Sequence, residues 1–137
     1  MKKFIFGMVV VAALILMDVR FPAAQGSATF TGELMDAVCA PMGSHDMMMK
    51  SNDLTQALQC VWFCLHFRKP GSRLVLYDAS SKTVYNLDDM GRCGAPLRCL
   101  RPWSAEKVKL TGTLDAATKT IKVTDVVSAN GGGAAKP

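Results

Sequence analysis

Five short segments of alternating polar and apolar residues limit what this chain can fold into. A period of two is typical of a β-strand with one buried face. The predicted strands span residues 29–35, 73–78, 83–87, 107–114 and 118–126. Strands this short leave unpaired edges in a flat open sheet, so we expect the sheet to close on itself as a small barrel.

One helix is expected between the first and second strands. Over residues 53–67, apolar residues recur at helical spacing and form one stripe: Leu54, Ala57, Leu58, Val61 and Leu65. Ser51 or Asn52 is the predicted N-cap, and the helix should end at residues 69–71, which read Lys-Pro-Gly. The flanking segments 36–53 and 88–104 lack a period and are predicted to be long loops.

These elements predict a mainly β fold, a small five-stranded OB-like barrel with one helix inserted between strands 1 and 2. Gly32 and Gly112 interrupt two strand patterns. A glycine at such a position often marks the bend that a barrel needs.

The N-terminus has the layout of a secretory signal peptide. An apolar run at residues 4–17 follows Lys2 and Lys3 and precedes small residues. The run is shorter than the roughly 20 residues of a membrane-spanning helix. We therefore predict a signal peptide at 1–28, an OB-like domain at 29–127, a disordered tail at 128–137, and a periplasmic or secreted protein. The alternative is an uncleaved leader, the one case in which the membrane is a partner.

Charge and motifs exclude several classes of function. The chain has 16 basic and 11 acidic residues. The predicted leader holds three of the basic residues and one of the acidic residues, so the part after the leader has a net charge of +3. This modest charge does not indicate a nucleic-acid partner, and export argues against one. The sequence has no P-loop and no GxGxxG, GxSxG or HExxH motif. We therefore predict a protein that is not an enzyme.

All five cysteines follow the leader, where an exported protein holds them as disulfides or metal ligands. Because five is odd, at least one cysteine lies outside any internal disulfide. Cys93 and Cys99 enclose a short loop and are predicted to form a structural disulfide. Cys39, Cys60 and Cys64 remain, and the last two lie one helical turn apart on the same face.

Three interpretations of these thiols stay open. A disulfide from Cys39 to Cys60 or Cys64 would tie the loop to the helix. A metal site of Cys39, His45, Cys60 and Cys64 would bind zinc or copper, because thiolates and imidazole are soft to borderline donors. In the third interpretation Cys60 and Cys64 form a redox-active thiol pair.

Methionines crowd the same loop and offer further soft ligands: Met42, Met47, Met48 and Met49. Alternatively, these flexible side chains fill gaps and cover the mouth of the barrel. Asp36 is predicted to cap a turn, with orientation of a metal ligand as the alternative. His66 is predicted to lie on the surface or at an interface.

A basic cluster with an aromatic residue is predicted on the surface between the third and fourth strands. It consists of Arg92, Arg98, Arg101 and Trp103. Such a surface suits an anionic glycan or a protein partner, although a solvated loop with one anchoring tryptophan has the same composition.

Four features together resemble a family of small exported bacterial domains with an OB-like fold. They are GELMDAVC at 32–39, His45, CVWFC at 60–64, and the strand pair at 107–126. The resemblance implies the fold and the export, and the family has no established activity. Our prediction is an exported, non-enzymatic binding module that binds zinc or copper. The alternatives are a disulfide-stapled module for a protein or glycan partner and, less favoured, a thiol-disulfide redox protein.

Overall fold

The structure is a computed structural model that describes residues 26–68, 72–91 and 97–131. Most of the predicted leader and tail, together with Arg92 and Cys93, therefore lies outside the described residues. Within them, the strands reach from Ala28 to Ser128.

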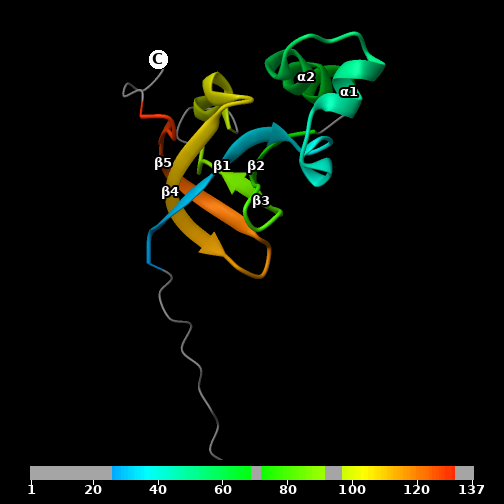
Figure 1. The fold of residues 1–137 in the computed structure, drawn as a ribbon. Coiled ribbons are helices and arrows are strands. Elements are labelled where there is room, and N and C mark those ends of the chain that lie inside the picture. The colour runs from blue at the N-terminus through cyan, green and yellow to red at the C-terminus, as the bar shows by residue number, and fades with distance from the viewer. Residues whose placement is uncertain (1–25, 69–71, 92–96, 132–137) are drawn as a thin grey trace, which may run out of the picture.

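Five strands form one sheet whose two ends meet, in the order β1-β2-β3-β5-β4 (Figure 1). The strands are β1 (Ala28–Asp36), β2 (Leu74–Asp78), β3 (Thr83–Asp88), β4 (Lys107–Asp115) and β5 (Thr120–Ser128). Neighbours pair antiparallel except β3 and β5, which run parallel. The prediction of a mainly β chain whose five strands close on themselves is confirmed.

The inner faces of the strands enclose an apolar core. Leu34, Leu76, Leu110 and Ile121 are fully buried there. The alternation places every second side chain of a strand inside, which is why the strand boundaries lie within two residues of those predicted from the sequence. Trp103, at the end of the 3-10 helix η3 (Arg98–Trp103), is only 3% exposed and packs in this core.

Two glycines allow the strands to approach each other closely. A Cβ atom at Gly32 would collide with the backbone carbonyl of Tyr77 on β2. A Cβ atom at Gly112 would collide with the carbonyl of Lys122 on β5, beside a register shift between Thr111 and Gly112. Both glycines thus lie at close contacts between strands, and the pairing is irregular at Gly112.

Two α-helices, not one, lie between β1 and β2: α1 (Asp46–Ser51) and α2 (Ala57–Phe63). A short 3-10 turn, η1 (Ala40–Met42), precedes them, and a π-helical turn, η2 (Cys64–Arg68), continues α2. Figure 1 shows α1 and α2 beside the C-terminal end of β1. Among the described residues, no helix combines the length and the apolar character that a membrane span requires.

The predicted start of the helix at residue 53 is wrong. The side chain of Asn52 donates to the carbonyl of Met48 and so closes α1 instead of capping the next helix. Asp53 then adopts a left-handed backbone with φ 51°, which interrupts the helix. Further on, Oε1 of Gln59 accepts a hydrogen bond from the backbone N–H of Gln56, and α2 begins at the next residue.

The buried face of α2 also differs from the predicted stripe. Leu58 is 43% exposed, whereas Cys60, Val61 and Cys64 are fully buried. Val61 of the predicted stripe does pack in the apolar core, and the two cysteines are buried beside it. The helix therefore buries its thiols together with Val61, while Leu58 of the predicted stripe faces outward.

A second buried cluster forms where these helices cover the outer face of β1 and β2. We call it the sulfur-rich cluster; it consists of Met35, Cys39, Ala40, Met48, Cys60, Cys64 and Val75. Met35 and Val75 follow the inward-facing Leu34 and Leu74, so they point to the opposite side of the sheet. The outer face of these strands is thereby buried as well, and three thiols lie within it.

Candidate metal centre

Four potential ligands converge inside the sulfur-rich cluster and its rim: Asp36, Cys39, His45 and Cys60. One ligand atom from each lies within 4.8 Å of the other three, and all four residues are buried. They come from the end of β1, the loop after it, the residue before α1, and α2. We call this group the candidate metal centre.

Asp36 folds the chain back toward the helices. One carboxylate oxygen, Oδ1, accepts hydrogen bonds from the backbone N–H groups of Val38 and Cys39, both at 2.9 Å. The predicted turn cap at Asp36 is confirmed. The second oxygen, Oδ2, is buried and has no hydrogen-bond partner. Because burying an unpaired carboxylate oxygen is costly, this atom suits a cationic ligand.

His45 is oriented by a carboxylate on its outer side. Its Nε2 lies 3.1 Å from Oε1 of Glu33. A neutral His45 that donates from Nε2 to this carboxylate keeps a lone pair on Nδ1. Nδ1 is buried without a hydrogen-bond partner and lies 3.9 Å from Oδ2 of Asp36. A carboxylate that fixes a histidine in this way is a common arrangement behind metal-binding histidines.

The thiols of Cys39 and Cys60 lie side by side. Their Sγ atoms are 3.7 Å apart, and both cysteines are free. A disulfide bond is about 2.05 Å long, so this distance is not that of a bridge. Two thiolates bound at about 2.3 Å to a tetrahedral zinc ion would lie about 3.8 Å apart. The observed separation therefore matches the edge of a tetrahedral thiolate site.

Cys64 lies next to the centre but outside the group of four. Its side chain is fully buried, and it interacts with both Asp36 and Cys39. The structure thus groups three of the four residues predicted as ligands, with Asp36 in the place that the sequence assigned to Cys64. Cys64, like Cys39 and Cys60, is a free thiol, so the disulfide that was one of the three open interpretations is not formed.

Burial and charge keep the three thiols protonated. Desolvation raises the pKa of Cys64 to about 12, and the Asp36 carboxylate adds to the shift. The pKa values of Cys39 and Cys60 are also raised, again first by burial. A bound cation would reverse these conditions, because metal ions bind the deprotonated thiolate and release its proton.

The methionines of the loop do not share one environment. Met47 is 62% exposed and Met42 is 40% exposed, whereas Met48 is buried in the sulfur-rich cluster. Met49 is partly buried against the same cluster. Only Met48 and Met49 therefore lie on the side of the loop that faces the thiols.

The residues of the predicted basic and aromatic surface do not share one surface in the structure. Arg98 and Arg101 are exposed, but Trp103 is in the core, so it is not the surface aromatic that the sequence suggested. The reason is that η3 turns its tryptophan toward the barrel. The aromatic neighbour of Arg101 is instead Trp62 of α2, with the guanidinium carbon 6.0 Å from the ring centroid.

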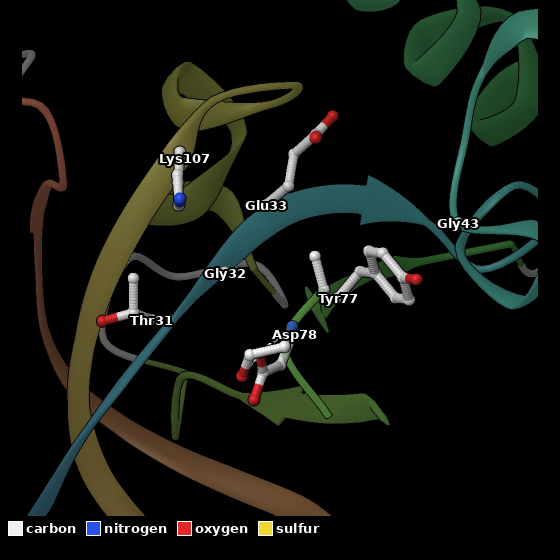
Figure 2. A pocket seen from close by; sticks show the side chains of 9 residues that line it. Thr31, Gly32, Glu33, Gly43, Tyr77, Asp78 and Lys107 are labelled. Carbon is white, nitrogen blue, oxygen red and sulfur yellow. Dashed lines mark hydrogen bonds between the residues drawn. The ribbon is translucent and has the colours of Figure 1, made fainter. Parts of the chain in front are cut away.

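Glu33 connects the buried centre with solvent. Its side chain is 38% exposed and lines a pocket of about 390 Å³. Figure 2 shows this pocket, with Glu33 of β1 and Lys107 of β4 on one side and Tyr77 and Asp78 of β2 on the other. The outer partner of His45 is therefore accessible although the four ligand atoms are buried.

Comparison with protein-family models, with characterised proteins and with solved structures finds no match for this chain.

Proposed function

We propose that this chain is an exported, non-enzymatic module of OB-like fold that binds a transition-metal ion at Asp36, Cys39, His45 and Cys60. The observation that carries the proposal is the pair of buried, unpartnered atoms that face each other, Oδ2 of Asp36 and Nδ1 of His45. Each such atom costs free energy in the absence of a partner, and one cation between them would satisfy both.

The donor set favours zinc. Two thiolates, one imidazole and one carboxylate are all regular zinc ligands, and four of them complete a tetrahedral shell. The Nδ1 to Oδ2 distance of 3.9 Å exceeds the roughly 3.3 Å edge expected for bonds of about 2.0 Å. A movement of about half an ångström by either side chain would close that edge. A full shell leaves no open position to activate water, which supports a binding role over catalysis.

Copper(I) is the second candidate, and the third thiol favours it. Soft cuprous ions select thiolates and thioethers. Cys64 lies beside Cys39, and Met48 belongs to the same buried cluster. A copper site of Cys39, Cys60 and Cys64 would not use Asp36 as a ligand. A substitution at Asp36 should therefore weaken zinc binding but leave copper binding unchanged, which separates the two candidates.

The OB-like assignment and the export form part of the same proposal. The strand order, with its parallel β3–β5 pair, supports an OB-like barrel. The apolar run at residues 4–17 behind two lysines supports export. The family resemblance at residues 32–39 and 60–64 is consistent with both.

The rival interpretations make different use of the thiols. A module stapled by a Cys39–Cys60 disulfide would need the sulfur atoms to approach from 3.7 Å to about 2.05 Å. A redox pair of Cys60 and Cys64 would need a lowered thiol pKa, whereas burial raises the pKa of both. The geometry therefore favours metal binding over thiol chemistry.

The deciding experiment is native mass spectrometry with metal analysis of the mature protein. We expect one zinc ion per chain. His45→Gln should abolish it, while His66→Gln serves as the matched control, because His66 is exposed and outside the centre. A metal-free protein that carries a Cys39–Cys60 disulfide would refute the proposal.

A further inference from the structure

A second pocket is lined by residues of η2, of β2 and the segment before it, and of η3 and the residue before it. It has a volume of about 390 Å³, within the range of small-ligand sites. Leu65, Leu74 and Leu97 supply an apolar lining, and Arg73, Arg101 and His66 supply the charged and polar groups. No carboxylate is among the described residues that line it.

Both arginines of this pocket are held in place by neutral partners. Nη2 of Arg73 donates a 2.7 Å hydrogen bond to the side-chain oxygen of Asn86. Arg101 lies over the ring of Trp62 at 6.0 Å. Neither partner carries a charge, and the ion pairs found among the described residues involve neither arginine. Two exposed guanidinium groups without a carboxylate partner among the described residues therefore lie at one pocket.

Two further polar groups complete the pocket. Oγ of Ser72 is buried without a hydrogen-bond partner among the described residues. His66 stacks on Trp62 with ring centroids 5.2 Å apart, and its Nδ1 lies 2.9 Å from the carbonyl oxygen of Trp62. That carbonyl only accepts, so Nδ1 donates, and Nε2 stays available at the pocket. Trp62, although it does not line the pocket, thus contacts two residues that do, His66 and Arg101.

We propose that this pocket binds a small organic carboxylate. The carboxylate head pairs with Arg73 and Arg101, whose planar forks match its two oxygens. The apolar body lies on the leucine lining, and the hydroxyl of Ser72 donates to the ligand. This site is independent of the metal centre, since no residue belongs to both.

The test uses the folded, mature protein titrated with benzoate at constant ionic strength and followed by calorimetry. We expect saturable binding that Arg101→Gln weakens about tenfold or more, because a charge-assisted pair is lost. Arg98→Gln is the matched control: Arg98 is exposed on the same 3-10 helix but does not line the pocket. The Arg98→Gln variant should bind benzoate with the same affinity as the unaltered protein.

Other probes separate the head of the ligand from its body. Benzamide lacks the charge, phosphate lacks the apolar body, and glucuronate carries its carboxylate on a polar ring, so all three should bind more weakly than benzoate. Arg73→Gln repeats the test from the other side of the pocket if Arg101→Gln fails to fold. The proposal is overturned by an absence of saturable benzoate binding, by equal losses in the Arg98 and Arg101 variants, or by tighter binding of any of the three other probes.

Discussion

Asp36→Asn separates the two tasks that Asp36 performs in this structure. The asparagine side-chain oxygen can still accept the hydrogen bonds from the N–H groups of Val38 and Cys39, so the turn is retained. The position of Oδ2 is taken by an NH₂ group, which donates hydrogen bonds and does not bind cations. The substitution therefore removes one metal ligand while it preserves the local fold.

The expected loss of zinc affinity is estimated by dividing the binding free energy of the site equally among its four ligands. Structural zinc sites bind with about 10–16 kcal/mol at neutral pH. Divided over four ligands, this is about 3 kcal/mol each, which corresponds to a loss in zinc affinity of about a hundredfold. In the metal-free protein, Asp36→Asn should leave the free energy of unfolding unchanged or raise it, because the substitution also removes a buried carboxylate that has an unpartnered oxygen.

The assay is a zinc competition titration at pH 7 in reductant, combined with thermal unfolding with and without metal. Zinc at a hundred times its dissociation constant should stabilise the unaltered protein by about 2.7 kcal/mol and the variant far less. Asp89→Asn is a close control. Asp89 is also buried, caps a turn through Oδ1 at 3.1 Å, and leaves Oδ2 unpartnered, but it lies outside the candidate metal centre.

Unchanged zinc affinity in Asp36→Asn would refute the reasoning. It would mean that the carboxylate is not a ligand and that Cys64 takes the fourth position, as the sequence alone suggested. An equal loss in Asp89→Asn would also count against it, since that change does not touch the centre.

The remaining predictions concern the outer partner of the histidine, the sheet and the thiols. Glu33→Gln removes the anionic acceptor that orients His45, so zinc affinity should fall about 10- to 100-fold in the same titration; an unchanged value would mean that this contact does not orient the ring. Gly112→Ala places a Cβ atom against the carbonyl of Lys122, so the free energy of unfolding in urea should fall by about 1–3 kcal/mol; full stability would show that the bulge relaxes. The metal-free, reduced protein should lose stability in urea as the pH rises above 9, because the folded pKa of Cys64 is about 12 and its ordinary value is 9.0. That contribution is complete below pH 9 and is lost toward pH 12 at about 1.4 kcal/mol per pH unit and thiol; a slope that Cys64→Ala leaves unchanged would contradict the assignment.

The strands were predictable because their signal is local. The alternation in residues 107–114, for example, places Val108 and Leu110 on one face whatever the rest of the chain does, and both are buried in the core. Gly112 was recognisable for the same reason. The closure of five short strands also followed from the need to remove unpaired edges.

The helical region was less predictable because competing local bonds decide its boundaries. Residues 53–67 have helical spacing, but the side chains of Asn52 and Gln59 divide the region between two helices. In the second of these helices Leu58 is exposed and Cys60 is buried. The spacing of apolar residues does not show which polar side chain will form a hydrogen bond with the backbone and so end or begin a helix.

The sequence by itself determined the five strands and singled out Cys39, His45 and Cys60 as chemically related residues. Only the tertiary structure brought Asp36 to them, moved Cys64 to the edge of the group, and gave His45 its outer partner, Glu33. Strand periodicity is a property of neighbouring residues, whereas a coordination shell depends on distances between segments that the sequence keeps apart. Those distances are set by how the helices pack on the outer face of β1 and β2, and packing of that kind leaves no periodic pattern in the chain.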